Sequence, residues 1–315
     1  MTLSDLDLSP GVVCALAFGW GCLWGSFVNV VIYRLPRGMS VVRPPSHCPS
    51  CGAPVRFFDN VPLVSFLVLR ARARCCGARL SVRYLVVELL GGLVSSAIAL
   101  LVLDTYGPNA PLAHVASIFL ADFALAMSLI AAAFIDAEHM YLPDAITLGG
   151  TVFGLATPAL RGLGWLDVLA GAAIGFVAVW LPFIALYKVL RGRAGMGLGD
   201  AKLVMLAGAW FGWSGAAFSL FAGAFQATLA ALGLLLVRGK IDEPDAVRAD
   251  REQLQKAAAE GDDEARQALE ADPLGSAPEP GFWTARLPFG PFLCLATIEW
   301  LLTEGLIRTR LSWLL

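Results

Sequence analysis

The sequence predicts an all-α polytopic membrane protein of about eight transmembrane helices, with a small cytoplasmic cysteine-containing loop domain of the zinc type. First, 57% of the 315 residues are hydrophobic and only 15% are charged, with a mean hydropathy of +0.70, whereas a soluble domain is about a quarter charged. Second, apolar segments long enough for a bilayer recur along the chain. Third, the charges gather in a few places, and the stretch 240–280 holds 12 of the 25 acidic residues. These observations exclude a soluble enzyme, a disordered protein and a nucleic-acid binder with a large basic face.

Eight apolar segments are candidate spans, because a bilayer core about 30 Å thick needs about 20 apolar residues per helix. They are 10–33, 85–103, 112–135, 145–161, 165–188, 201–213, 215–237 and 288–307. The sixth is short and is either a half-span or a tilted pair with the seventh. The first follows nine residues without Lys or Arg, so we expect a retained helix and not a cleavable signal peptide.

Basic residues predict which side of the membrane each loop occupies. The loop 34–84 has a single acidic residue, Asp59, against nine arginines at positions 34, 37, 43, 56, 70, 72, 74, 79 and 83. We therefore expect this loop in the cytoplasm, and alternation then places 136–144, 189–200 and 238–287 on the same side. The C-terminus, with Arg308 and Arg310, falls outside, against the rule.

The polar stretch 240–280 is expected to be an acidic cytoplasmic insert. The pairs Glu252–Lys256 and Asp262–Arg266 are four residues apart, which favours an exposed helix. Residues 276–281 are typical of a linker. A solvated helical appendage is the favoured interpretation, and partner docking is the alternative.

Two carboxylates stand at the cytoplasmic ends of expected spans. Asp136 ends the apolar segment 112–135, and Asp200 follows the glycine-rich residues 195–199 and opens the next apolar run. An ionisable residue at the edge of the hydrocarbon is costly and therefore indicates a function. Helix capping is the structural alternative for an aspartate at such a position.

The chemistry of such a pair is specific. Two carboxylates that share a site hold one proton between them. The ionised one can take a proton from a water that attacks a peptide carbonyl, and the protonated one can polarise that carbonyl and protonate the leaving nitrogen. This is aspartic peptidase chemistry, and the glycines before Asp200 would let an extended substrate approach closely. Position alone also allows a structural network or ion transport.

The cysteines fall into two groups. Three of the seven, Cys14, Cys22 and Cys294, lie in apolar segments and are interpreted as small buried hydrophobic residues. The other four lie in the expected cytoplasmic loop, a reducing compartment, where a metal site is favoured over disulfides. We predict that zinc is held by these four, Cys48, Cys51, Cys75 and Cys76.

The two halves of this predicted zinc site differ. His47-Cys48-Pro-Ser-Cys51-Gly has the spacing of a zinc knuckle. The second half, Arg74-Cys75-Cys76-Gly77, lacks that spacing, because Ala73 occupies the expected position of a cysteine. Two alternatives follow: His47 replaces Cys75 as the fourth ligand, or the loop folds without zinc.

Several motifs together resemble the type IV prepilin peptidases, the leader peptidase/N-methyltransferases of type IV pili and type II secretion. The resemblance covers nearly the whole chain except the insert, and the order of the motifs makes it specific. The motifs are Gly25-Ser-Phe-Val-Asn29 through Arg34-Leu-Pro36, the cysteine loop with Asp59-Asn60-Val-Pro62, Ser81-Val-Arg83-Tyr84 through Glu88, Asp136 to Asp144, Gly197-Leu-Gly199-Asp200-Ala-Lys202, and Leu287-Pro-Phe-Gly290-Pro-Phe.

The resemblance implies a GxGD-type intramembrane aspartic peptidase of the bacterial inner membrane. It places the two catalytic aspartates on Asp136 and Asp200 and not on Asp144. The implied substrates are prepilins and pseudopilins, cleaved after a Gly on the cytoplasmic side. The implied second activity is N-methylation of the new N-terminus with S-adenosylmethionine.

The resemblance also implies a division of the chain. Residues 1–103 form the methyltransferase-linked half with the cysteine loop 34–84, and 104–237 form the peptidase core. The acidic insert 238–287 and the last helix with the C-terminus, 288–315, follow.

Other charged residues have open roles. Arg34, Arg83, Tyr84 and Glu88 are candidates for the methylation step, with pairing to Arg83 as the structural alternative for Glu88. Lys202 is expected to hold Asp200 ionised or to balance a carboxylate, with extension of the side chain toward the interface as the structural alternative. His139 is expected to be a solvated interface histidine, and tuning of the pH response is the alternative.

Asp122 and Glu299 lie inside expected spans, so both are candidate functional residues. They support a competing hypothesis, an ion-coupled transporter in which Asp122, Asp136, Asp200 and Glu299 form a carboxylate relay. Such transporters have broken helices in both halves, but the break at 195–199 has no partner in the first half. A third hypothesis is a membrane scaffold that recruits partners through the cysteine loop and the insert.

Overall fold

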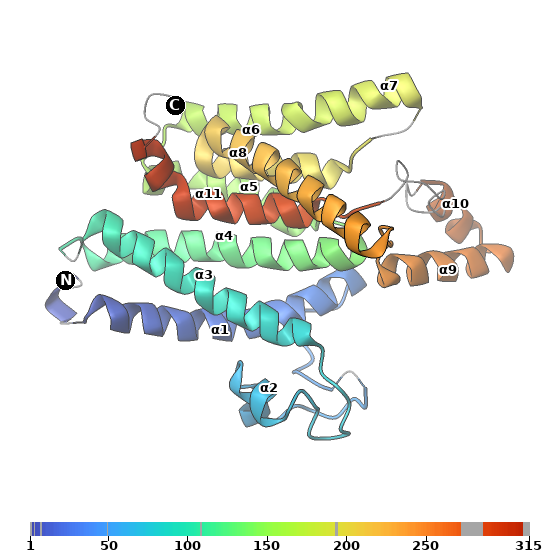
Figure 1. Ribbon diagram of the computed structural model, residues 1–315, viewed down its shortest axis with the longest axis horizontal. Coiled ribbons are helices and arrows are strands. Elements are labelled where there is room, and N and C mark those ends of the chain that lie inside the picture. Colours follow the sequence, from blue (N-terminus) through green and yellow to red (C-terminus); the bar gives the residue numbers. More distant parts are fainter. Residues whose placement is uncertain are drawn as a thin grey trace.

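The computed structural model describes residues 2, 4–6, 8–48, 50–107, 109–192, 195–271 and 286–310, and it is mostly helical, as expected (Figure 1). The long helices are α1 (Pro10–Arg34), α3 (Val82–Tyr106), α4 (Leu112–His139), α6 (Trp165–Val179), α8 (Leu198–Arg238) and α11 (Gly290–Arg310). The shorter ones are α2 (Val64–Val68), α5 (Asp144–Ala156), α7 (Tyr187–Arg191), α9 (Asp245–Ala259) and α10 (Asp263–Ala271). A π-helical stretch, Trp180–Leu186, joins α6 to α7.

Among the described residues, five helices are long and apolar enough to cross a membrane. They are Pro10–Arg37, Val82–Tyr106, Leu112–His139, Trp165–Arg191 and Leu198–Arg238. The expected eight spans are therefore not confirmed. The segment 145–161 became the short α5, the segments 201–213 and 215–237 share α8, and α11, which corresponds to 288–307, is not among the five.

α8 turns back on itself at Gly212. This residue has φ 71° and ψ −168°, a conformation outside the helical region that glycine adopts without a steric penalty. A Cβ on Gly175 of α6 would lie 2.5 Å from the Val204 oxygen and 3.2 Å from Cβ of Ala216. In a straight helix those two residues would be about 18 Å apart, so the arms 198–211 and 213–238 must fold back on each other.

α1 and α3 approach closely through glycines. A Cβ on Gly91 would lie 2.6 Å from the Gly21 oxygen, and a Cβ on Gly25 would lie 2.8 Å from Cα of Glu88. Small residues at such positions let the backbones of membrane helices pack against each other. α1 and α3 form one side of the molecule, and the cysteine loop with α2 connects the end of α1 to the start of α3 (Figure 1).

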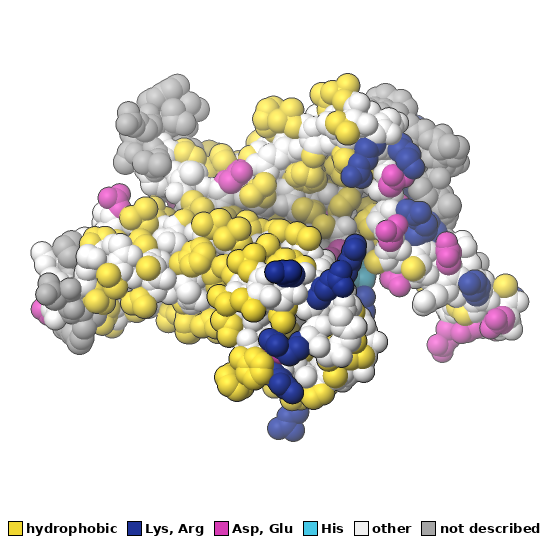
Figure 2. All heavy atoms as spheres, turned by 60° about the horizontal axis from the view of Figure 1, so that its bottom comes forward, with side chains coloured by type: hydrophobic (Ala, Val, Ile, Leu, Met, Phe, Trp, Pro, Cys, Tyr) yellow, Lys and Arg dark blue, Asp and Glu magenta, His cyan; other side chains and the backbone are white. Residues whose placement is uncertain are grey.

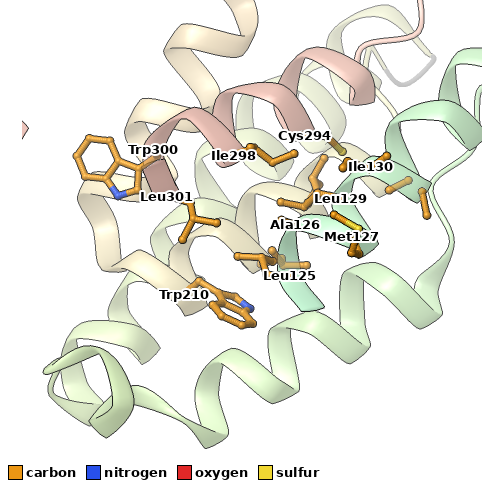
Figure 3. Close-up of a cluster of buried hydrophobic side chains, with 14 of the residues drawn as sticks. Leu125, Ala126, Met127, Leu129, Ile130, Trp210, Cys294, Ile298, Trp300 and Leu301 are labelled. Carbon is orange, nitrogen blue, oxygen red and sulfur yellow. The ribbon is translucent and has the colours of Figure 1, made fainter. Parts of the chain in front are cut away.

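α4 lies between that pair and the second group of helices, and it packs against α1, α3 and α11. The buried cluster in Figure 3 brings Leu125 and Leu129 of α4 together with Trp210 of α8 and Ile298 and Leu301 of α11. A helix surrounded on several sides needs apolar residues around its whole circumference. That requirement makes the two acidic residues of α4 within this core, described below, exceptional.

Polar and apolar side chains separate on the surface. Figure 2 shows hydrophobic side chains over most of the long helices, whereas Lys and Arg gather on the cysteine loop and acidic side chains gather toward α9 and α10. A bundle embedded in lipid exposes apolar side chains along its length and keeps charged ones at its ends. The surface therefore agrees with a membrane protein that carries polar attachments at one end.

The described part of the acidic insert contains the helices α9 and α10, as expected, but it is not a detached appendage. α9 packs against α4, and Nδ1 of His139 lies 4.0 Å from Oδ2 of Asp250. The expected pair Asp262–Arg266 is replaced by one between Arg266 and Asp263, at 3.5 Å. The expected linker 276–281 lies outside the described residues.

A buried ion network attaches the start of the insert to the bundle. The side chain of Glu243 is 5% exposed, and its oxygens lie 2.6 Å from Nη2 of Arg251 and 3.3 Å from Nη1 of Arg286. Arg286 lies four residues before the start of α11. The network therefore connects the segment that follows α8 with the segment that leads into α11.

Candidate active site

The ends of five helices meet at one end of the bundle. Three contacts show this: Arg83 to Glu138 at 2.6 Å, Lys202 to Asp144 at 2.6 Å, and the Gly290 N–H to Asp136 at 2.9 Å. The starts of α3, α5, α8 and α11 and the end of α4 therefore lie together. The cysteine loop connects to the same end, since it follows α1 and precedes α3.

Asp136 lies in the last turn of α4 and is buried, with 6% of its surface exposed. Its Oδ2 accepts a hydrogen bond from the backbone N–H of Gly290, the first residue of α11. The first N–H groups of a helix have no partner within the helix, so this one is available for the carboxylate. A Cβ on Gly290 would lie only 2.7 Å from the same oxygen. The contact therefore requires glycine.

Asp200 lies in the first turn of α8, where the positive end of the helix dipole favours a carboxylate. The backbone of Gly197, the residue that caps this helix, is hydrogen-bonded to the Asp200 side chain. Gly199 faces Leu142, because a Cβ on Gly199 would lie 3.0 Å from Cβ of that leucine. Gly197 therefore contacts the Asp200 side chain, and Gly199 allows Leu142 to pack closely.

The structure brings Asp136 and Asp200 together. The two carboxyl groups interact electrostatically with each other, and both interact with the thiol of the fully buried Cys294. Leu142 contacts both sides of the site, since it also lies 3.1 Å from the position of a Cβ on Gly290. Asp144 stays outside, because its side chain is 61% exposed and is paired with Lys202.

The structure tests three expectations about residues near Asp136 and Asp200. Lys202 balances Asp144. The alternative for Glu88 is wrong: Arg83 contacts both oxygens of Glu138, because the packing of α3 on α4 brings that carboxylate to it. Glu88 instead accepts the backbone N–H of Leu63 at 2.8 Å. The expectation for His139 is also wrong, since α9 covers it and leaves its side chain 12% exposed.

The cysteine loop contains two similar turns. In the first, Cys48 N donates to the Ala53 oxygen and Gly52 N to the Cys48 oxygen; in the second, Ala73 N donates to the Ala78 oxygen and Gly77 N to the Ala73 oxygen. Gly52 and Gly77 share a φ of 71°. Ala73 therefore occupies the place of Cys48, and Cys76 the place of Cys51. Cys75 comes from the tip of the second turn, a position that spacing alone did not identify.

All four cysteine sulfurs of these turns lie within 4.8 Å of one another. The separations are 3.7 Å for Cys48–Cys76, 3.4 Å for Cys51–Cys75 and 3.9 Å for Cys75–Cys76. A Zn–S bond of about 2.3 Å in a tetrahedron sets the sulfurs about 3.8 Å apart. The four residues therefore fit a tetrahedral zinc ion, and this cluster of sulfurs does not include His47.

Electrostatics within the cluster also favour a metal. Backbone hydrogen bonds at Ser50 and Cys51 lower the pKa of Cys48 to about 6. Contact with the Cys51 thiol raises the pKa of Cys75 to about 12. Four crowded thiols cannot all ionise alone, whereas a dication stabilises coordinated thiolates.

Asp122 and Glu299 lie away from the pair. Asp122 is 14 residues before Asp136 on the same helix, which corresponds to about 21 Å along the axis. It interacts electrostatically with Arg161 and Glu304, and Glu299 accepts a hydrogen bond from Gln226 at 2.6 Å. Both carboxylates therefore have partners of their own within the bundle.

Two residues of the site were missed from sequence. Gly290 and Leu142 were quoted only as parts of motifs, and neither was given a role. A glycine just before an apolar segment was the available signal for Gly290. Of the four residues suggested for methylation, Arg34, Tyr84 and Glu88 line one cavity, and Arg83 is not among the residues that line it.

The fold and the site define a class: a helical membrane protein with two carboxylates near each other at one end of the bundle. Comparison with known proteins identifies the family within this class. Residues 123–232 match the type IV leader peptidase family, and residues 20–102 match the bacterial peptidase A24 N-terminal domain. The chain belongs to the type IV leader peptidase family.

Curated relatives agree with this assignment. The chain is 34% identical over 263 residues to the prepilin leader peptidase/N-methyltransferase of Neisseria gonorrhoeae, which covers 76% of this chain and 88% of that protein. It is 35% identical to the protein of that name from Aeromonas hydrophila, over 73% of this chain and 83% of that protein. The protein of that name from Myxococcus xanthus is 37% identical, over 76% of this chain and 69% of that protein. No solved structure shows a significant match.

Proposed function

We propose that this chain cleaves the basic leader from prepilins or pseudopilins after a Gly and then methylates the new N-terminal amine. The names of the curated relatives support both activities. The observation that carries the peptidase half is the placement of Asp136 beside Asp200, with the Gly290 N–H bound to Asp136. Two carboxyl groups that share one proton are the arrangement that aspartic peptidases use to hydrolyse a peptide bond.

In the proposed mechanism the pair shares one proton. The ionised carboxylate takes a proton from water, and the water oxygen bonds to the peptide carbonyl carbon. The protonated carboxyl group hydrogen-bonds the carbonyl oxygen and then transfers its proton to the leaving nitrogen as the C–N bond breaks. Gly290 holds the Asp136 carboxylate in place, and Gly197 holds that of Asp200.

The membrane placement is part of the same proposal. The apolar helices and the family indicate an inner-membrane protein, and the nine arginines of the cysteine loop support a cytoplasmic position for that end of the bundle. A substrate with a basic leader and an apolar helix would present its cleavage point at this interface. The exposed carboxylates of the insert would attract such a leader.

The first half of the chain, residues 1–103, is assigned to methylation and the cysteine loop. Cys48, Cys51, Cys75 and Cys76 would hold zinc, which would fasten the two turns to each other as a structural site. S-adenosylmethionine, when bound, supplies the methyl group. Residues 104–237 then form the peptidase core, with the insert 238–287 and the last helix, 288–315, completing it.

The transporter hypothesis is not favoured. A carboxylate relay needs acidic residues within reach of one another, but about 21 Å of helix separates Asp122 from Asp136. Asp122 is engaged with Arg161, and Glu299 with Gln226.

The proposal is tested with purified protein, a prepilin-like peptide and S-adenosylmethionine, with mass spectrometry reporting leader loss and methyl gain separately. Asp136→Asn and Asp200→Asn should each reduce leader cleavage by at least a thousandfold, because the amide can neither accept nor deliver the proton. Both variants should still methylate a peptide supplied without its leader.

Asp144→Asn is the matched control, because Asp144 is exposed and paired with Lys202 at the same end of the bundle. It should keep cleavage within about fivefold, the loss of one surface ion pair being worth about 1 kcal/mol or less. Full cleavage by Asp136→Asn or Asp200→Asn would refute the peptidase mechanism. Absence of methyl gain in the wild type would refute the second activity.

A further inference from the structure

A cavity of about 520 Å³ lies between the ends of α1 and α3 and the cysteine loop. Small-molecule sites in proteins have volumes of about 300–1,000 Å³. The cavity is separate from the aspartate pair: Asp136 and Asp200 are absent from its lining, which comes from residues 26–34, 46–48, 53–74 and 75–88. Its size and concavity make it a candidate ligand site on the methyltransferase-linked half of the chain.

Asn29 lines this cavity and carries one polar atom that has no hydrogen-bond partner among the described residues. The residue is 1% exposed, and its Nδ2 donates to the Tyr84 oxygen at 3.2 Å and to the Gly25 oxygen at 3.3 Å. Its Oδ1 is buried and has no hydrogen-bond partner among the described residues. A buried acceptor without a partner destabilises the folded state, so a ligand that donates a hydrogen bond to this oxygen would relieve that cost.

Opposite charges also line the cavity. Glu88 is 8% exposed and Arg34 is 4% exposed. Glu88 is held in place by the Leu63 N–H and the Ser26 hydroxyl, and Arg34 donates to the carbonyl oxygens of Ser40 and Pro45. A buried anion and a buried cation on one cavity suit a zwitterionic ligand, because each charge of the ligand can meet its opposite.

Aromatic rings complete the lining. Tyr33, Tyr84 and Phe66 are among the residues that line the cavity. Flat faces of this kind stack on nucleobases. The lining thus offers partners for a base and for an amino-acid zwitterion.

We propose that this cavity is the S-adenosylmethionine site, with Glu88 and the Oδ1 atom of Asn29 as the groups that orient the ligand. The inference rests on the proposed methylation activity and adds to it the place and the residues of the methyl donor. The ligand class is an adenosine joined to an amino acid, which matches the aromatic faces and the paired charges.

The position of the cavity also suits a second step after cleavage. α3 carries Tyr84 and Glu88 on the cavity, and the neighbouring Arg83 is bonded to Glu138, two residues beyond Asp136. The start of α3 therefore contacts both the cavity and the end of α4 that carries Asp136. A new N-terminal amine released at Asp136 would reach the methyl donor by moving along the start of α3.

The test measures binding directly and not turnover. S-adenosylhomocysteine is titrated into the purified full-length protein in detergent by calorimetry. In a parallel experiment, radiolabelled S-adenosylmethionine is crosslinked to the protein by ultraviolet light and mapped by peptide sequencing. Binding of one equivalent is expected, with the label in 26–34 or 80–88.

Two variants change the cavity in different ways. Glu88→Gln keeps an acceptor for the Leu63 N–H but removes the charge, and it should weaken binding at least tenfold. Ala53→Trp fills the cavity without changing its charge, and it should also weaken binding at least tenfold. Elution volume and melting temperature establish that each variant is folded.

Asp104→Asn is the matched control, because Asp104 is an exposed carboxylate at the other end of α3. Its affinity should stay within twofold of wild type. If the wild type binds but the affinities of Glu88→Gln and Ala53→Trp are unchanged, or the label maps elsewhere, the cavity assignment is overturned and methylation stands. If the wild type neither binds nor methylates, the proposed methylation falls, and this inference falls with it.

Discussion

The backbone N–H of Gly290 donates a 2.9 Å hydrogen bond to Oδ2 of Asp136, and this contact joins the first residue of α11 to the last turn of α4. The two residues are 154 positions apart in the sequence. Asp136 is at the C-terminal end of its own helix, where the dipole is unfavourable to an anion. The positive N-terminal end of α11 supplies the opposite field, so the fold corrects the electrostatics of the site with a second helix.

Gly290→Ala should disable the peptidase specifically. The new Cβ would lie 2.7 Å from Oδ2 and 2.9 Å from Cγ of Asp136, so the carboxylate must move. Misplacement of a catalytic group by about 1 Å costs about a hundredfold in rate. We expect a loss of that size in the cleavage rate constant, measured by mass spectrometry of a prepilin-like peptide.

Gly233→Ala is the control for that substitution, because a Cβ on Gly233 would meet nothing within 4 Å. It adds the same methyl group to α8 and should leave cleavage within twofold of wild type. Methylation of a peptide without its leader should be unaffected in both variants. Cleavage by Gly290→Ala at the wild-type rate would contradict the role given to this glycine.

The two similar turns of the cysteine loop predict that a cysteine at position 73 can replace Cys75 as a zinc ligand. Cys75→Ser should lower the zinc content of the purified protein well below one ion per chain, because it removes one of the four sulfurs. Ala73 stands where the first turn has Cys48. Adding Ala73→Cys to Cys75→Ser should therefore restore the metal, as measured by atomic emission.

Cys14→Ser serves as the comparison, since Cys14 lies on α1 and outside the sulfur cluster. Its zinc content should equal that of the wild type. Failure of the double variant to regain metal would show that the two turns are not interchangeable. A full zinc content in Cys75→Ser would show that this thiol is not a ligand.

Close packing of α1 on α3 predicts a stability effect. Gly91→Ala would place a Cβ 2.6 Å from the backbone oxygen of Gly21, which cannot rotate away. Overpacking of this kind costs about 1–3 kcal/mol. We expect a lower melting temperature in detergent for Gly91→Ala, and no change for Gly19→Ala, whose Cβ would meet nothing within 4 Å. Equal melting temperatures would contradict the close approach of the two helices.

Asp136 and Asp200 could be chosen as candidates from the sequence because few charges stand at the ends of apolar segments. The sequence did not predict the contacts that hold their carboxyl groups in place. The Gly290 contact uses a backbone N–H, and every residue except proline has one, so no residue type marks it. The partner of Arg83 was also missed, because Glu138 reaches it only through the packing of α3 on α4.

The number of spans was the least predictable feature of the fold. The division of one apolar run into 201–213 and 215–237 lies close to Gly212, whose positive φ reverses the direction of α8. Hydropathy did not show that 145–161 would form only the short α5. In the cysteine loop, spacing identified Cys48 and Cys51 but could not show that a second turn of the same shape presents Cys75 from its tip.

The ion network of the insert predicts a pH dependence. Burial opposes ionisation of Glu243, but hydrogen bonds and charges from Arg251 and Arg286 outweigh it and hold the pKa of Glu243 below its usual value of 4.5. A carboxyl group with a lowered pKa in the folded state stabilises that state above its ordinary pKa, and the stabilisation is lost as the pH falls through the lowered value. The insert should therefore stay attached at neutral pH and loosen below about pH 4.5.

Spin labels introduced as unnatural amino acids at Gln255 of α9 and Leu148 of α5 would report this change as a broader distance distribution in acid. Glu243→Gln should show the broad distribution already at neutral pH, because the amide cannot pair with the two arginines as a charge. Asp245→Asn is the matched control, since that side chain is 99% exposed, and its distances should follow the wild type at every pH. A narrow distribution for Glu243→Gln at neutral pH would mean that the packing of α9 on α4 holds the insert without the ion network.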